Sequence, residues 1–140
     1  MRVFFAAPLF NEAERDFNQK AAELLRGEGF DVWLAQEHKF IGRRLLSEKR
    51  EILEEDLEAL RRSDLVVAVL DGLDVDTGVA FEMGFAHALG KQILGLKTDH
   101  RVFSEFEPVN LMLEAPLAGL CRSLAETIEF LRNMGKREKR

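Results

Sequence analysis

The stretch "DLVVAVLDGLDVDTGVAFEMG", residues 64–84, joins the most apolar run of the chain to an acidic, glycine-containing turn and then to a helix. Residues 64–70 are a continuous, β-branched run without alternation, which predicts a strand buried on both faces of a parallel sheet. The segment from about 76 to 89 then has the length and composition of a helix. Strand, turn and helix in this order predict part of a βαβ unit.

The same alternation continues on both sides of this stretch. Further strands are predicted at 2–7, 30–35 and 91–97, and further helices at about 11–26, 43–62 and 117–133, with an irregular segment at 98–113. Asn11, with Glu14 three residues later, has the pattern of a capping box at the start of the first of these helices. The sequence therefore predicts an α/β fold: a small doubly wound parallel sheet in a three-layer sandwich of flavodoxin-like or Rossmann-like type.

Domain organisation and the place of a ligand follow from this fold. A single domain is expected over residues 1–135, with a basic tail at 136–140. In the strand order 2-1-3-4-5, ligands bind beyond the carboxyl ends of strands one and three. The loops there are "APLFN" (residues 7–11) and "DGLDVDTG" (71–78), so the acidic turn is expected to face a ligand crevice.

Composition and motifs argue against several classes of function. The net charge of −5 argues against a nucleic acid polymer as partner, because phosphate binding needs an excess of Lys and Arg. No stretch approaches the roughly 20 apolar residues of a membrane span. Cys121 is the only cysteine, so no internal disulfide can form, and we expect a cytoplasmic protein. Because HExxH, Cys/His, P-loop and GxSxG motifs are missing from the sequence, we expect no metal, no cofactor and no serine nucleophile.

Glu82 is the candidate nucleophile. Its neighbours three and four positions away on the predicted helix are all small or apolar: Gly78, Val79, Phe85 and Ala86. Glu82 therefore faces a core or a cavity, either as a glutamate with structural hydrogen bonds or as a reactive carboxylate. The preceding turn adds three aspartates, and interacting carboxylates divide into one ionised group and one that carries a proton. Cleavage of a glycosidic bond uses such a pair.

The chain resembles the nucleoside 2-deoxyribosyltransferase family. The resemblance rests on three segments that occur in the family's order: "VFFAAPLFNEAE" (3–14), "SDLVVAVLDGLDVDTGVAFEMGFAHALGK" (63–91) and "VNLM" (109–112). It implies an enzyme that cleaves the N-glycosidic bond of a 2′-deoxyribonucleoside through a covalent deoxyribosyl-glutamate and transfers the sugar to another nucleobase.

The resemblance also implies roles for individual residues. Glu82 matches the family's nucleophile, and Asp76 matches the acid that protonates the leaving base. Asp56 matches a further aspartate that the family places near the base. Gly78 lies between Asp76 and Glu82 in the family's D-x-G-x-x-x-E element.

Other residues are expected to bind the substrate. Pro8 and Phe10, at the end of strand one, would form an apolar wall for the base, and Gln36 is the expected base contact in the segment 36–40. Asn110 and Met112 match a segment that the family inserts into the site of a neighbouring subunit. The resemblance therefore implies a homodimer or higher homo-oligomer with shared sites; the alternative for the apolar segment 106–116 is a loop that folds over its own sheet edge.

Two features leave other functions open. The family often has a tyrosine on strand one that hydrogen-bonds the nucleophile, whereas this chain has no tyrosine and carries Phe4 and Phe5 there. A sister group, the 2′-deoxynucleoside 5′-monophosphate N-hydrolases, shares the fold and the glutamate but resembles "GSIRGG" where this chain has "AAPLFN". A further alternative is a non-catalytic module of this fold that binds nucleosides or nucleotides. The expected ligands are a 2′-deoxyribonucleoside, or its 5′-monophosphate, and a free nucleobase.

Overall fold

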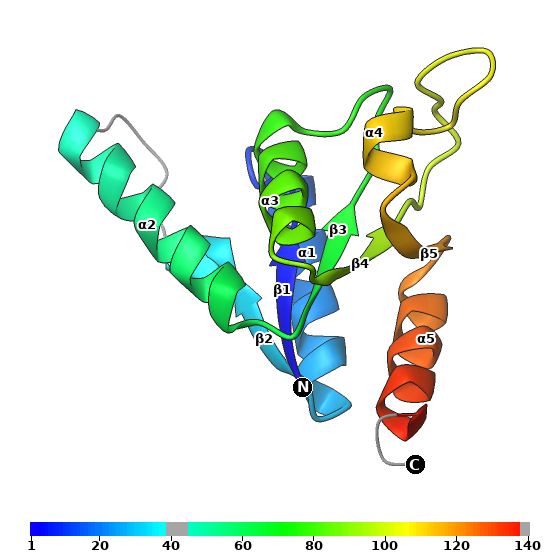
Figure 1. Ribbon diagram of the computed structural model, residues 1–140, viewed down its shortest axis with the longest axis horizontal. Coiled ribbons are helices and arrows are strands. Elements are labelled where there is room, and N and C mark those ends of the chain that lie inside the picture. The colour runs from blue at the N-terminus through cyan, green and yellow to red at the C-terminus, as the bar shows by residue number, and fades with distance from the viewer. Residues whose placement is uncertain (39–44, 138–140) are drawn as a thin grey trace.

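The structure, a computed structural model, describes residues 1–38 and 45–137, and these residues contain one sheet of five parallel strands (Figure 1). The strands are β1 (Arg2–Ala6), β2 (Asp31–Leu34), β3 (Leu65–Val69), β4 (Gln92–Leu96) and β5 (Leu117–Cys121). Their order is β2-β1-β3-β4-β5, which confirms the predicted doubly wound topology. All five residues of the central strand β3 are buried, as its continuous apolar run predicts.

Helices cover both faces of the sheet. They are α1 (Glu12–Gly27), α2 (Leu46–Arg62), α3 (Thr77–Ala88), α4 (Leu111–Glu114) and α5 (Leu124–Arg137), with a short 3-10 helix η1 (Ala35–Glu37) after β2. Two hydrophobic clusters show which helices share a face: α1 and α5 pack on one side of the sheet, and α2 and α3 on the other. The molecule is therefore a three-layer sandwich, as predicted.

Strand β1 shows the two-residue period that divides these clusters. Val3 and Phe5 point into the cluster beneath α1 and α5, whereas Phe4 and Ala6 point into the cluster beneath α2 and α3. Phe4 and Phe5 are each 1% exposed. Phe4 or Phe5 stands where the resemblance implies a single tyrosine, and both are buried apolar rings.

Helix α2 leaves the body of the domain at its amino-terminal half (Figure 1). Its buried residues, Asp56, Leu57, Ala59 and Leu60, all lie in the carboxyl-terminal half. Leu46 and Leu53, in the projecting half, are 64% and 41% exposed. This part of the chain therefore leaves leucine side chains partly or largely exposed to solvent.

The prediction of one helix over about 117–133 was wrong at its start. Residues 117–121, "LAGLC", form the edge strand β5, in which the Cys121 carbonyl accepts the Lys97 N–H at 2.9 Å. Leu and Ala are good helix formers, so local propensity favoured a helix, but pairing with β4 determines the structure. The true start of α5 is marked by Ser123, whose Oγ accepts the Glu126 N–H at 3.2 Å.

The carboxyl-terminal segments differ from expectation in two further respects. The segment predicted to be irregular contains the short helix α4, which Asn110 caps. Helix α5 runs to Arg137, two residues into the predicted tail, and residues 138–140 lie outside the described part of the chain. No helix among the described residues is long and apolar enough to cross a membrane.

Candidate active site

A cavity of about 490 Å³ opens beyond the carboxyl ends of β1 and β3. One wall comes from the loop after β1 and the start of α1, with Pro8, Phe10 and Asn18. The opposite wall comes from the turn after β3, with Asp74 and Asp76. The cavity therefore lies at the point of the sheet where strand order reverses and where ligands of this fold bind.

The apolar wall is fixed from behind by Asn18 of α1. Asn18 is 2% exposed, and its Nδ2 donates to the Pro8 carbonyl at 2.9 Å and to Gln36 Oε1 at 3.1 Å. Gln36 Nε2 in turn donates to the Arg15 carbonyl at 2.9 Å. The amide of Gln36, the expected base contact, is thus engaged with α1. Phe10 is 69% exposed, and its ring stands at the rim of the cavity.

The reasoning from sequence missed Asn18, although a signal was present. Asn18 precedes the buried residues Ala21, Ala22 and Leu25 by three, four and seven positions, so it lies on the apolar face of an amphipathic helix. A polar side chain on such a face needs a hydrogen-bond partner inside the protein.

Asp76 caps the amino terminus of α3. Its Oδ2 accepts the Val79 N–H at 3.1 Å, and the half-buried side chain lines the cavity. Gly78 makes room for this carboxylate, because a Cβ at Gly78 would lie 3.1 Å from Asp76 Oδ2. Within the described residues, Asp76 Oδ1 makes no hydrogen bond, which leaves that oxygen available to a ligand.

Glu82 lies in the second turn of α3 and is half-buried. Val79 and Ala86, three before it and four after it, are buried in the core. Phe85, three after it, contacts the guanidinium of Arg61 on α2, with 5.3 Å between Cζ and the ring centroid. Glu82 therefore lies on the side of α3 that faces the sheet and α2.

Asp56 lies on the side of α2 that faces the sheet and α3. It is 8% exposed, and Ala59 and Leu60, three and four residues later, belong to the same core cluster as Val79 of α3. The structure thus places Asp56 and Glu82 on the sides by which α2 and α3 pack against the sheet and against each other.

Asn110 and Met112 lie apart from this cavity, at helix α4. Asn110 Oδ1 accepts the Met112 N–H at 3.0 Å, and the Met112 side chain is 74% exposed. Met112 and Leu113 line a second, largely apolar cavity of about 350 Å³ with Met83 and Gly84 of α3. Of the predicted site residues, the cavity around Asp76 brings together Pro8 and Phe10 with Asp76, but its described lining does not include Gln36, Asp56, Gly78, Glu82, Asn110 or Met112.

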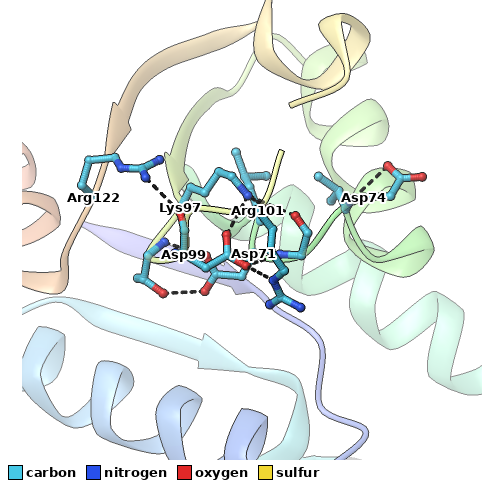
Figure 2. A network of polar contacts seen from close by, with 10 residues as sticks. Asp71, Asp74, Lys97, Asp99, Arg101 and Arg122 are labelled. Carbon is cyan, nitrogen blue, oxygen red and sulfur yellow. Dashed lines mark hydrogen bonds and ion pairs between the residues drawn. The ribbon is translucent and has the colours of Figure 1, made fainter. Parts of the chain in front are cut away.

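A polar network after β4 supports the acidic turn (Figure 2). Asp99 accepts hydrogen bonds from Lys97 Nζ at 2.8 Å, from the Gly72 N–H at 2.8 Å and from Arg101 Nε at 2.5 Å. Burial raises the pKa of the Asp99 carboxyl, but the hydrogen bonds from Lys97, Gly72 and Arg101 outweigh it and hold the pKa at about 2. The reasoning from sequence did not identify these residues, although Lys97 directly follows an apolar strand.

Metal chemistry finds no support in the described residues. In residues 1–38 and 45–137 no three His, Cys, Asp or Glu side chains gather in a way that could hold a metal ion. Asp71 and Asp76 of the turn instead accept main-chain N–H groups, and Asp99, which follows β4, binds the Lys97 ammonium.

Solved structures resemble this fold over nearly the whole chain. The 2-deoxyribosyltransferase of Bacillus psychrosaccharolyticus is 23% identical with a TM-score of 0.79, and the match covers 91% of this chain and 90% of that one. A conserved protein from Enterococcus faecalis V583 is 27% identical with a TM-score of 0.81, covering 96% and 98%. The CMP N-glycosidase of Clostridium botulinum is 21% identical with a TM-score of 0.62, covering 94% and 99%. No curated protein matches the sequence.

The sequence itself matches a family model. The model described as nucleoside 2-deoxyribosyltransferase aligns with residues 3–121, which run from the second residue of β1 to the last residue of β5 and contain the whole Asp76–Glu82 element. The chain therefore belongs to the nucleoside 2-deoxyribosyltransferase family and is an enzyme of the transferase or related N-glycoside hydrolase type.

Proposed function

We propose that this enzyme cleaves the N-glycosidic bond of 2′-deoxyribonucleosides through a deoxyribosyl ester of Glu82 and transfers the sugar to a second nucleobase. The observation that carries the proposal is the placement of two carboxylates on one helix. Asp76 caps α3 and lines the cavity, and Glu82 follows in the second turn of α3. Membership of the family supports the assignment of roles to these two residues.

The chemistry needs both groups. A Glu82 carboxylate oxygen attacks C1′ while the C1′–N bond breaks and its electron pair passes to the base. Asp76 gives a proton to the departing base, which is a poor leaving group without it. A second base, or water, then attacks C1′ and releases Glu82, and Asp76 recovers its proton from that nucleophile. Asp56 is proposed to contact the base, and the apolar wall of Pro8 and Phe10 to stack against it.

Electrostatics favours a nucleoside over its 5′-monophosphate. Four carboxylate side chains, Glu14, Asp71, Asp74 and Asp76, line the described part of the cavity together with one cation, Arg101. The Arg101 side chain is already paired with Asp99. A phosphate monoester carries a charge of roughly −1.5 to −2 near neutral pH, and like charges placed together oppose binding.

Hydrolysis of a 5′-monophosphate is the second candidate. It is supported by the fold shared with a CMP N-glycosidase and by a guanidinium group, that of Arg101, at the cavity wall. In this candidate reaction the same Glu82 ester would be resolved by water. The candidate requires Arg101 to leave Asp99 or to bind phosphate with its terminal nitrogens.

We further propose that the active unit is a homo-oligomer in which Asn110 and Met112 of one chain complete the site of its neighbour. Both residues lie outside their own chain's cavity around Asp76, and Leu111 and Met112 are 56% and 74% exposed. The adjacent apolar cavity between α3 and α4, about 350 Å³ in volume, offers a place for a side chain of a second copy. The projecting half of α2 exposes further leucines for the same purpose.

One assay separates these functions. The protein is incubated with a 2′-deoxyribonucleoside or with its 5′-monophosphate, each with and without a second nucleobase, and products are separated by chromatography. The proposal predicts a new deoxyribonucleoside only when a second base is present. Free base from the monophosphate alone supports the second candidate, and the absence of any released base from all mixtures indicates a binding module.

A further inference from the structure

Lys97 is a buried cation at the carboxyl end of β4. Its side chain is 1% exposed. The Nζ donates to the Leu70 carbonyl at 3.3 Å, to the Gly72 carbonyl at 3.1 Å and to Asp99 Oδ1 at 2.8 Å. An ammonium group has three donors, so this arrangement uses all of them and offsets the cost of burying the charge.

Further hydrogen bonds join the turn after β3 to the residues that follow β4. The Gly72 N–H donates to Asp99 Oδ2 at 2.8 Å, and Gly72 has a φ of 112°, in the region that favours glycine. Asp71 accepts the Thr98 N–H and the Thr98 hydroxyl, each at 2.6 Å. Residues 70–72 are therefore held on residues 97–99 through both main-chain and side-chain groups (Figure 2).

These hydrogen bonds hold the start of the acidic wall of the cavity, residues 71–76. Asp71 and Gly72 belong to the held turn and line the cavity, and Asp74 and Asp76, which also line it, follow within four residues. A buried lysine is not needed to close the sheet itself, because β3 and β4 pair along their whole length. The network therefore acts on the wall rather than on the strands.

We propose that Lys97 is a positioning residue that holds the wall 71–76, and with it the Asp76 carboxylate, where it meets the leaving base. This inference rests on the proposed function for its catalytic consequence. Removal of the Lys97 ammonium would leave the Leu70 and Gly72 carbonyls and the Asp99 carboxylate without the donor that they share.

Lys91 provides a matched control at the opposite end of β4. Its Nζ also donates to two main-chain carbonyls, those of Arg61 at 2.9 Å and Ser63 at 2.5 Å. Lys91 and Lys97 thus directly precede and follow the same strand. Lys97 binds Gly72, which lines the cavity, whereas Arg61 and Ser63 are not among its described lining residues. A loss of stability alone would appear in both variants.

The test compares Lys97→Met with Lys91→Met on two substrates: an ordinary deoxynucleoside and one whose base departs without protonation. If Lys97 positions Asp76, Lys97→Met slows the ordinary substrate at least about tenfold more than the second, with most of the loss in kcat. Lys91→Met is expected to leave the ratio of the two substrates' rates unchanged. Equal slowing of both substrates by Lys97→Met would overturn the proposal.

A second readout does not depend on turnover. Amide hydrogen exchange in residues 70–77 is expected to rise at least about tenfold in Lys97→Met but not in Lys91→Met. If Lys97→Met does not fold, Thr98→Val, which removes one hydrogen bond to Asp71, shows the same change with smaller size. Unchanged exchange in the folded variants refutes the positioning role. If the unaltered protein releases no base, the proposed function fails, and the exchange measurement alone decides whether Lys97 holds the wall.

Discussion

Gly78 and the carboxylate of Asp76 are so close that a single added carbon would touch: a Cβ at Gly78 would lie 3.1 Å from Asp76 Oδ2. The glycine in the first turn of α3 is therefore a spatial requirement of the acid that caps the helix. This contact connects the sequence element D-x-G with the shape of the cavity wall.

Gly78→Ala is the first prediction. Alanine gains about 1 kcal/mol of helix propensity over glycine, so the free energy of unfolding is expected to change little or to rise. Base release is expected to fall, because the new methyl group displaces the Asp76 carboxylate. Gly135→Ala on α5 is the control, since within residues 1–38 and 45–137 no atom beyond its chain neighbours and the adjacent helix backbone would lie within 4 Å of a Cβ there. Full activity of Gly78→Ala would show that the position of the Asp76 carboxylate tolerates the displacement.

The leaving-group acid is tested by Asp76→Asn. The amide retains a carbonyl oxygen that can accept the Val79 N–H, so α3 keeps its cap. General acid assistance contributes about 100- to 10,000-fold, so cleavage of ordinary nucleosides is expected to slow by that order. A substrate whose base leaves without protonation is expected to lose far less. Equal losses for both would assign Asp76 to the helix cap alone.

Stability is predicted to fall in acid because of Asp99. Its pKa of about 2 lies below the ordinary value of 3.8, so the ionised form stabilises the fold fully above about pH 4. As pH falls from about 4 to 2, roughly 2 kcal/mol is lost from this group. Denaturant unfolding at a series of pH values measures the slope. Asp99→Asn is expected to be less stable at pH 6 and to show a shallower decline; an unchanged slope would contradict the role given to this carboxylate.

Shared sites are tested by complementation. Glu82→Ala and Asn110→Ala proteins, each inactive alone, are mixed under conditions that permit subunit exchange. If Asn110 serves a neighbour, a mixed dimer has one site with both lesions and one with neither, so activity returns. Exchange demonstrated by mass spectrometry without any recovery would place Asn110 in its own chain's site.

Much of the fold could be predicted from sequence because local and long-range preferences agree there. The apolar run of β3 and the capping box at Asn11 each allow one interpretation, and the structure confirms both. The edge strand β5 could not be predicted from its residues, since "LAGLC" has helical propensity and becomes a strand only through pairing with β4.

Some residues of the candidate site could likewise be predicted from the sequence, and others could not. Asp76, Pro8 and Phe10 could be placed together because the carboxyl ends of neighbouring parallel strands share one edge of the sheet. Asn18 and Lys97 were not predicted. The apolar surroundings of Asn18 in the sequence indicate a buried polar group, but the carbonyl groups that Asn18 and Lys97 bind lie in other segments, and no side-chain pattern identifies them. Asn110 and Met112 lie at α4, away from this cavity, and their role in a neighbouring chain stays a prediction.

The proposed reaction requires that Glu82 form a covalent bond to the sugar. The most direct measurement is mass spectrometry of protein quenched during turnover with a deoxynucleoside and then digested, with Glu82→Gln as the control. A mass increase of one deoxyribosyl unit is expected on the peptide that contains Glu82, and no such increase is expected in the variant. A folded Glu82→Gln protein that releases base at a near-normal rate, or a deoxyribosyl group found on another residue, would contradict it.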